Sequence, residues 1–246
     1  MKISLLTDIG QKRSNNQDYV NKYDNKAGIT LLLLADGMGG HRAGNIASEM
    51  TVTDIGREWV NTDLTELSQI KNWLMAVIEA ENQKIYEVGQ NDAYKGMGTT
   101  IEAIAIVGNT VLYAHLGDSR IGLIRENTYK LLTNDHSLVN ELVRAGQITE
   151  EEAANHPQKN IITQSIGQPK PVEIDLGVQT LEPGDYLLVN TDGLTNMISE
   201  QNILDILAQD MSLDNKAKLL VSLANEAGGL DNITVALLQA ESEASS

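Results

Sequence analysis

Short apolar segments of strand length recur along the chain and are separated by polar residues. They cover residues 3–6, 29–35, 101–107, 111–116, 121–124, 186–189 and 233–238. The pair Gly108-Asn109 follows the third of these segments, and the pair Glu126-Asn127 follows the fifth. Because such residues favour tight turns between strands, the pattern predicts hairpins and therefore antiparallel pairing.

Two long segments, residues 43–60 and 67–88, instead carry apolar residues at helical spacing. Shorter helices are predicted over residues 137–145, 149–154, 200–208 and 215–227. Thr149 is followed three residues later by Glu152, the capping-box arrangement that begins a helix. Locally paired strands and paired helices favour an α+β fold over a parallel βαβ sheet. One layered solution packs two antiparallel sheets together and covers their outer faces with helix pairs.

The length of 246 residues allows one large domain or two small ones, and no Gly/Ser-rich linker divides the chain. We therefore expect a single domain over residues 1–240, followed by a polar, disordered tail over residues 241–246. Residues 145–171 are polar and only weakly periodic, which predicts an excursion from the core.

The composition excludes several classes of function. Lys and Arg number 18 against 34 Asp and Glu, a formal charge of −16. This charge repels nucleic acids and anionic lipids, and no basic run offsets it, so no nucleic-acid partner is expected. The absence of cysteine excludes disulfides, Cys-ligated metals and thiol-based phosphate hydrolysis. No apolar run has the length of a spanning helix or a signal peptide, which predicts a cytoplasmic protein without membrane insertion.

Aspartates stand at the ends of the apolar segments. Asp36, Asp118 and Asp192 directly follow or nearly follow such segments, Asp231 precedes the last one, and Asp18 precedes a possible strand. A single aspartate at a strand end commonly begins a turn or caps a helix. Several together at one end of a compact domain would repel one another, and a multivalent cation relieves that repulsion. All-oxygen ligands suit Mg²⁺ or Mn²⁺, and also Ca²⁺, better than zinc.

Two such ions held a few ångströms apart would define the chemistry. A water molecule bridging them loses a proton near neutral pH and attacks phosphorus in line, without a covalent enzyme intermediate. Arg13 lies five residues before Asp18 and is a candidate for binding phosphate, because a guanidinium group contacts two phosphate oxygens at once. The alternative for Arg13 is an exposed, solvated side chain.

At this point the sequence resembles a known family, the bacterial type 2C (metal-dependent) serine/threonine protein phosphatases. The motifs that carry the resemblance occur in order over almost the whole chain. They are Arg13-Ser-Asn-Asn-Gln-Asp18, Ala35-Asp-Gly-Met-Gly-Gly40, Gly98-Thr-Thr100, Gly117-Asp-Ser-Arg120, Asp135-His-Ser137, Leu188-Val-Asn-Thr-Asp-Gly193 and Asp231-Asn-Ile-Thr234. The resemblance implies a four-layer αββα sandwich and an enzyme that hydrolyses phosphoserine and phosphothreonine with Mg²⁺ or Mn²⁺.

The resemblance also implies roles for individual residues at the metal centre. Asp36 would bridge two metal ions, and the backbone carbonyl of Gly37 would bind one of them. Asp192 and Asp231 would hold the other ion, and Asp18 would act through coordinated water.

Further roles are implied outside this two-metal core. Asp118, together with Asp192, matches a third metal site, Arg13 matches the phosphate-binding arginine, and Asn232 would support the last ligand by hydrogen bonding. Residues 145–171 correspond to the family's flap, which influences substrate choice. The closest form occurs in Gram-positive bacteria beside a transmembrane Ser/Thr kinase, so that kinase is the expected partner of a monomeric phosphatase.

Two positions depart from the family's pattern. Met38 stands where some eukaryotic members have a histidine that is proposed as the general acid, so another group must protonate the leaving group. His41, three residues later, is a weak candidate for this role. Gln17 stands where other members carry Glu, which leaves one negative charge fewer in the first motif.

Two alternative functions remain. A non-catalytic regulatory module could use the same fold for partner binding, although such a module is expected to lose its metal carboxylates and this chain keeps them. A related two-metal hydrolase acting on a small phosphate ester is the second alternative, because the flap and groove decide the size of the substrate.

Overall fold

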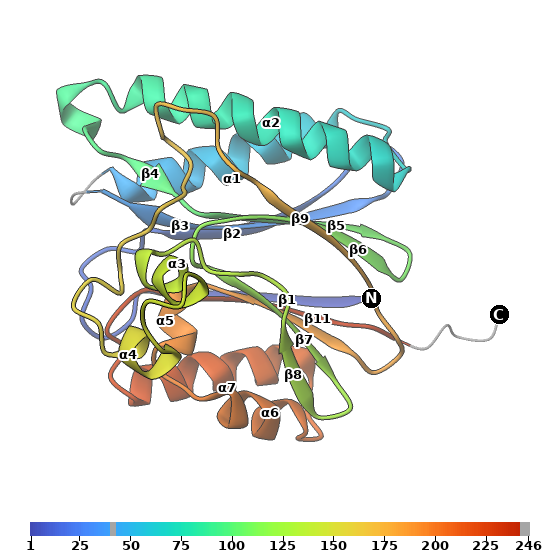
Figure 1. Cartoon of the computed structure of the whole chain (residues 1–246). Coiled ribbons are helices and arrows are strands. Elements are labelled where there is room, and N and C mark those ends of the chain that lie inside the picture. Colours follow the sequence, from blue (N-terminus) through green and yellow to red (C-terminus); the bar gives the residue numbers. More distant parts are fainter. Residues whose placement is uncertain (40–42, 242–246) are drawn as a thin grey trace.

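The computed structural model describes residues 1–39 and 43–241 and places two antiparallel sheets face to face (Figure 1). Sheet I contains, in order, β1 (Lys2–Asp8), β11 (Ile233–Gln239), β10 (Tyr186–Asn190), β7 (Arg120–Arg125) and β8 (Thr128–Leu131). Sheet II contains β2 (Asp18–Asp24), β3 (Thr30–Met38), β5 (Ile101–Val107), β6 (Thr110–Leu116) and β9 (Asp175–Thr180). The short β4 (Gly98–Thr99) pairs with the end of β3.

Helices form the two outer layers. Sheet II is covered by α1 (Gly44–Val60) and α2 (Leu67–Val88), and sheet I by α6 (Glu200–Leu207) and α7 (Leu213–Glu226). The short η1 (Asp92–Tyr94) follows α2. At one end of the sandwich lie α3 (Leu138–Arg144), α4 (Glu150–Ala154) and α5 (Asp192–Thr195) (Figure 1). The predicted α+β, four-layer αββα sandwich is confirmed.

Side-chain alternation along β3 shows how the sequence builds these layers. Leu31 and Leu33 pack in the core beneath α1 and α2, whereas Leu32 and Leu34 pack in the core between the two sheets. A strand buried on both faces reads as a continuous apolar run, because successive side chains point to opposite faces. This alternation also decides where the polar residues at the end of the strand point.

Both predicted hairpins form. Strands β5 and β6 pair across Gly108, and β7 and β8 pair with Arg125 opposite Thr128. Glu126 and Asn127 both have positive φ angles, 49° and 58°, which match the type I′ turn favoured by the twist of a two-residue hairpin. Helix α2 has the predicted bounds, whereas α7 begins two residues earlier than predicted because Ser212 caps it.

The segment over residues 145–171, here called the flap, leaves the sandwich after α3. Its helix α4 begins with the predicted capping box between Thr149 and Glu152. The chain returns to the sandwich through isolated bridges that join Ile162 to Ser137 and Ile166 to Thr99. The flap is therefore attached to the residue that caps α3 and to β4 of sheet II.

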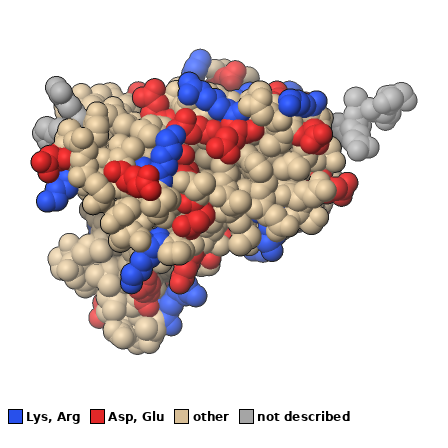
Figure 2. All heavy atoms as spheres, turned by 90° about the horizontal axis from the view of Figure 1, so that it is seen from above, with Lys and Arg blue, Asp and Glu red and all other residues tan. Residues whose placement is uncertain are grey.

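Charged side chains are interspersed over the face formed by α1 and α2 (Figure 2). Lys84 of α2, for example, forms an ion pair with Asp54 of α1. Within residues 1–39 and 43–241, no helix is both long enough and apolar enough to cross a membrane. Glu241 lies 3.1 Å from Lys2 in an ion pair, and the rest of the predicted tail lies outside the described residues.

Candidate active site

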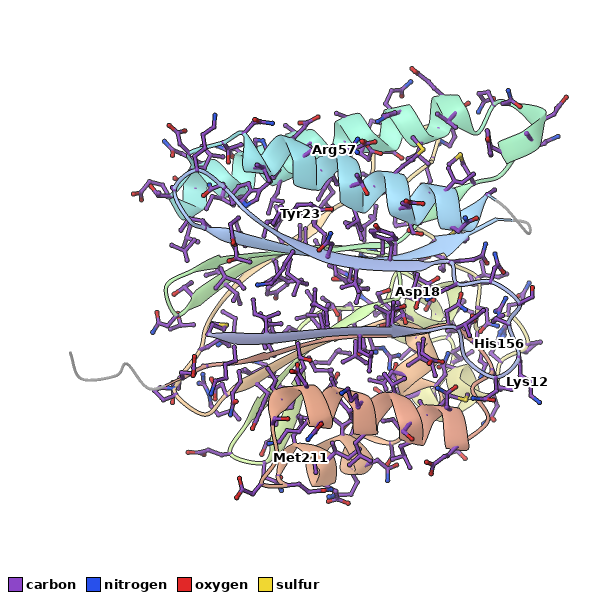
Figure 3. All side chains as sticks on the ribbon, turned by 180° about the vertical axis from the view of Figure 1, so that it is seen from behind. Lys12, Asp18, Tyr23, Arg57, His156 and Met211 are labelled. Atoms are coloured by element: carbon purple, nitrogen blue, oxygen red, sulfur yellow. The ribbon has the colours of Figure 1, made fainter. Side chains whose placement is uncertain are left out.

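The five predicted aspartates gather at one end of the sandwich. Asp18 of β2 lies directly opposite Asp36 of β3 in the antiparallel register. Both continue the set of positions that face the other sheet, as Val20 and Leu34 do. Figure 3 shows Asp18 at this end, between the two sheets. A carboxylate there faces the opposite sheet rather than the helices.

The remaining three aspartates lie beside the ends of sheet I strands. Asp192 begins α5 directly behind the end of β10, and Asp231 lies two residues before β11. Asp118 lies in the connection from β6 to β7, next to Gly117 with a φ of 123°. Because β10 runs antiparallel to its neighbours β7 and β11, the end of β10 and the starts of β7 and β11 lie at the same end of sheet I. The sequence positions far apart in the chain therefore converge in space.

Asp18 joins the two sheets through its carboxylate. Its Oδ2 accepts hydrogen bonds from Thr191 Oγ1 at 2.9 Å and from Thr234 Oγ1 at 2.7 Å, both from sheet I. Only 6% of Asp18 is exposed. Burial raises the pKa of Asp18 to about 7, although the two hydroxyl groups oppose this rise. The sequence predicted no role for the two threonines. The only sign of such a role in the sequence is that each is a polar residue inside or beside an apolar strand.

Mutual repulsion adds to burial at the other aspartates. Burial raises the pKa of Asp36 well above its usual range, and the carboxylates of Asp18, Asp192, Asp118 and Asp231 raise it further. Burial and then Asp192 raise the pKa of Asp118 to about 7. Burial and then Asp231 raise the pKa of Asp192 to about 6. The charged forms of Asp18, Asp36, Asp118 and Asp192 are thus disfavoured in one shared electrostatic environment, which favours an added cation.

The chemistry of this donor set fits a hard dication such as Mg²⁺ or Mn²⁺, because every charged donor is a carboxylate oxygen. In the described part of the chain, however, no three His, Asp or Glu side chains stand close enough to enclose an ion as they are placed. Several of the carboxylates contact protein donors instead. Asp18 accepts from threonines, and Asp192 accepts from Asn196 Nδ2 at 2.9 Å.

Arg13 lies beside Asp231. Its Nη2 is 2.6 Å from Asp231 Oδ2, and 47% of the Arg13 side chain is exposed. The other carboxylate oxygen of Asp231 accepts the backbone N–H of Asn232 at 2.8 Å. The predicted phosphate-binding arginine therefore lies at the edge of the aspartate cluster, with its guanidinium group accessible to solvent.

Asn232 fixes the segment that carries Arg13. Its Nδ2 donates to the carbonyls of Ile9 and Asn15 at 2.9 and 3.0 Å, and its Oδ1 accepts the N–H of Gln17 at 2.8 Å. The predicted support for Asp231 thus comes from the backbone of Asn232, while its side chain holds residues 9–17 against the cluster.

Gln17 and Gly37 form the neighbouring wall. The Gln17 carbonyl accepts hydrogen bonds from the Gly37 N–H and from Ser48 Oγ, and Gln17 Nε2 donates to the Gly39 carbonyl at 3.3 Å. A side chain at position 37 would collide with the carbonyl of Gly44, so only glycine fits this close approach. Gln17 therefore joins the end of β3 to α1 by hydrogen bonds, at the position where the resemblance expects a carboxylate.

The backbone of Asp36 is held by a further network that the sequence did not reveal. Asp36 N–H donates to Thr100 Oγ1 at 2.9 Å, and the Asp36 carbonyl accepts from Thr99 Oγ1 at 2.8 Å. Thr100 Oγ1 also lies 3.0 Å from Ser119 Oγ, next to Asp118. The motif Gly98-Thr-Thr100 thus ties Asp36 to the connection that carries Asp118.

Met38 occupies the position at which some eukaryotic members have the histidine proposed as the general acid. Met38 ends β3 and pairs with Gly98 of β4, and its thioether has no proton to donate. The alternative donor, His41, lies outside the described residues.

A cavity of about 570 Å³ opens beside the cluster. Asp118 and Asp192 line one side of it, and residues of α3 and the flap, among them Val143 and Glu150, line another. The volume is in the range of ligand-binding clefts in general. The cavity places the flap within reach of a molecule bound at the aspartates.

Comparison with known proteins decides the family. Residues 10–226 match the protein phosphatase 2C family. The chain belongs to this family. It is 62% identical over 243 residues to protein phosphatase PhpP of Streptococcus pneumoniae, covering 99% of both chains. The resemblance read from the motifs is confirmed, and the chain is a protein-serine/threonine phosphatase.

Solved structures of family members share the fold. The serine/threonine phosphatase of S. agalactiae is 68% identical, with a TM-score of 0.97 over 98% of this chain and 99% of that one. The catalytic domain of the phosphatase PstP, solved in complex with two manganese ions, is 33% identical, with a TM-score of 0.84 over 98% of both chains. Protein phosphatase 2C enzymes are metal-dependent, and the bound manganese in PstP agrees with that property.

Proposed function

We propose that this phosphatase hydrolyses phosphoserine and phosphothreonine in proteins by direct attack of water, with Mg²⁺ or Mn²⁺ as cofactor. The observation that carries the proposal is the convergence of five aspartates, four of which (Asp18, Asp36, Asp118 and Asp192) have pKa values raised by burial and by neighbouring carboxylates. Such a cluster costs free energy unless a cation neutralises it. The chain has no cysteine, so hydrolysis through a cysteinyl phosphate is excluded.

The proposal gives each aspartate a distinct role. Asp36, Asp192 and Asp231 would hold two ions with the backbone carbonyl of Gly37, and Asp18 would contribute through water. Its hydrogen bonds to Thr191 and Thr234 leave the Oδ1 atom of Asp18 available for such a contact. When bound, the ions would acidify a water molecule and polarise the phosphate.

Two further assignments complete the site. Asp118 would bind a third ion together with Asp192, in the cavity that the flap also lines. Arg13 would orient the phosphate, because its exposed guanidinium lies within 2.6 Å of Asp231 and is long enough to turn toward solvent. Asn232 would keep Arg13 in place through residues 9–17. Since Met38 is not an acid, protonation of the leaving group would come from solvent.

The biological setting is proposed on the resemblance alone. We expect residues 1–240 to act as one catalytic domain and as a monomer in the cytoplasm. The partners would be Ser/Thr-phosphorylated signalling proteins, including the cytoplasmic part of a transmembrane Ser/Thr kinase, and no nucleic acid.

A substrate comparison tests the proposal against a small-ester hydrolase. We expect Mn²⁺-dependent hydrolysis of both an aryl phosphate and phosphothreonine peptides, lost on chelation and in Asp192→Ala. The values of kcat/KM for the peptides should exceed those for free phosphorylated metabolites, because a peptide reaches the flap. Activity that persists without divalent metal would contradict the mechanism, and a preference for metabolites would contradict the substrate class.

Arg13→Ala tests the phosphate-binding role. We expect KM to rise about tenfold with a smaller change in kcat, since the lost contact is a charge-assisted hydrogen bond to substrate. Arg13→Lys is the matched control, which keeps the charge and loses the two-pronged geometry, and it should recover only part of the affinity. Bound metal, measured by elemental mass spectrometry, should stay the same in both variants, and its loss would show that Arg13 instead supports Asp231.

A further inference from the structure

We propose that Arg120 and Asp135 form a positioning pair that fixes α3, and through it the flap, to the aspartate cluster and thereby sets selectivity for protein substrates. The flap is joined to this segment because Leu138 N–H donates to the Ile161 carbonyl at 2.9 Å and Thr163 N–H donates to the His136 carbonyl at 2.8 Å. This inference rests on the proposed function, because it concerns how that site accepts a polypeptide. The pair belongs to two motifs, Gly117-Asp-Ser-Arg120 and Asp135-His-Ser137, and neither Arg120 nor Asp135 has a role so far.

The contact between the two side chains is a two-pronged ion pair. Arg120 Nε donates to Asp135 Oδ1 and Oδ2 at 2.9 and 3.2 Å, and Arg120 Nη2 donates to Oδ2 at 2.6 Å. The Asp135 side chain is only 18% exposed and that of Arg120 is 33% exposed. Because the planar guanidinium fits the carboxylate at several points, this geometry fixes orientation as well as distance.

The residues on either side of Asp135 are fixed as well. The carbonyl of Asn134 lies 2.9 Å from Nε2 of His115, and Nδ1 of His115 lies 2.6 Å from Glu102. Both His115 and Glu102 are fully buried in sheet II. A buried polar pair contributes little to stability compared with apolar packing. We therefore assign the pair of His115 and Glu102 the role of fixing the position of the Asn134 backbone.

His136 completes the anchor. Its backbone N–H donates to the Gly117 carbonyl at 2.7 Å, and its Nδ1 accepts the Gly117 N–H at 3.2 Å. Its ring packs on that of His115 with centroids 4.6 Å apart. Three consecutive residues are thus held from sheet I, from sheet II and from the connection beside Asp118.

The anchored segment leads directly into one wall of the cavity. Ser137 caps α3, and Asn140 of that helix donates from Nδ2 to the Asp135 carbonyl at 2.7 Å. Arg120, Asp135 and Asn140 line the cavity together with Asp118 and Asp192. The Arg120–Asp135 pair therefore sets the separation between the aspartates and α3, which is the space that a peptide beside a phosphorylated residue would enter.

The same strand offers a matched control. Arg125, at the far end of β7, forms an equivalent ion pair with Asp185, with Nε–O distances of 3.1 Å and an Nη2–Oδ2 distance of 2.6 Å. Its side chain has the same 33% exposure as that of Arg120. Removing this pair tests the general cost of losing an Arg–Asp contact on β7, far from the flap.

Electrostatics alone would act differently from anchoring. Burial is the main cause of the raised pKa of Asp118 and of Asp192, but Arg120 lowers these pKa values and Asp135 raises them. Removing Arg120 should therefore weaken metal binding, and removing Asp135 should strengthen it, if charge is what matters. Anchoring instead predicts that removing either Arg120 or Asp135 lowers the selectivity for peptide substrates.

The experiment compares Arg120→Met and Asp135→Asn with Arg125→Met and Asp185→Asn. We expect the ratio of kcat/KM for a phosphothreonine peptide to that for an aryl phosphate to fall about tenfold in both cavity variants, chiefly through KM for the peptide. The double variant should be no worse than either single one, because the two residues act as a unit. Both Arg125→Met and Asp185→Asn should retain the original ratio.

Amide hydrogen exchange gives a readout that does not depend on activity. Exchange in α3 should accelerate about tenfold in Arg120→Met and Asp135→Asn and should stay unchanged in the Arg125 and Asp185 variants. Unchanged exchange in α3, or opposite changes of the kinetic ratio in the two cavity variants, would overturn the proposal. An inactive wild-type protein that still shows the exchange pattern would instead contradict the proposed function and leave the anchor standing.

Discussion

Asp36→Asn is expected to reduce Mn²⁺-dependent hydrolysis of a phosphothreonine peptide by about 100- to 1,000-fold, the range seen when a main electrostatic group of a site is removed. Asp36 lies at the centre of the cluster, since each of the other four aspartates acts on its pKa. The substitution keeps the shape of the side chain and removes the charge that two ions would share. Elemental mass spectrometry should show loss of bound manganese together with loss of kcat/KM.

The same substitution should stabilise the protein in chelator. Without metal, burial and the four neighbouring carboxylates disfavour the charged form of Asp36, and an amide at this position is neutral at every pH. We expect the free energy of unfolding in EDTA, measured with urea, to increase by roughly 1–3 kcal/mol. Lost activity combined with gained stability is expected for a residue that serves function and lowers the stability of the fold.

Asp24→Asn is the matched control for Asp36→Asn. Asp24 lies at the other end of the β2–β3 pair, is exposed, and accepts a hydrogen bond from Thr30. Its replacement should leave both activity and bound metal unchanged. If Asp36→Asn retained its manganese and most of its activity, the assignment of Asp36 as the bridging ligand would be wrong.

The sequence predicted the strands that are buried on both faces, and it missed two edge strands, β8 and β9. Residues 101–107 form a continuous apolar run and were predicted with their observed bounds. The edge strands β8 and β9 have mostly exposed or partly buried residues, so their apolar pattern is weak. Their pairing depends on the neighbours β7 and β6, which a local pattern does not contain.

The candidate site divides in the same way. Aspartates at the ends of apolar segments were predictable, because a charge is unexpected where a buried strand stops. Their partners were not, since Thr191, Thr234 and Thr100 are ordinary residues of β-structure until their distances are known. The pairing of Arg13 with Asp231 joins residues 218 positions apart and follows only from the fold.

The stability of the protein in EDTA should fall as the pH rises from about 4 to 7. Burial raises the pKa of Asp18 to about 7, so between these values the folded chain binds a proton that the unfolded chain has released. By linkage, the unfolding free energy then decreases with increasing pH. The rise of the Asp18 pKa to about 7 corresponds to roughly 4 kcal/mol of unfolding free energy, and the raised pKa values of Asp118 and Asp192 act in the same direction.

Adding Mn²⁺ should reverse this loss at pH 7 and have little effect at pH 5, because protonated carboxylates bind metal poorly. Asp18→Asn should flatten the slope, since an amide oxygen still accepts from Thr191 and Thr234 but has no proton to release. Glu102, whose pKa burial raises to about 7, contributes a part that metal does not alter, because it is fully buried against His115. Urea unfolding at several pH values, with EDTA or with Mn²⁺, separates the pH dependence that metal removes from the pH dependence that metal leaves unchanged. A stability that rises with pH in EDTA would show that the folded chain does not raise the pKa values of these aspartates, and the metal centre would lose its physical basis.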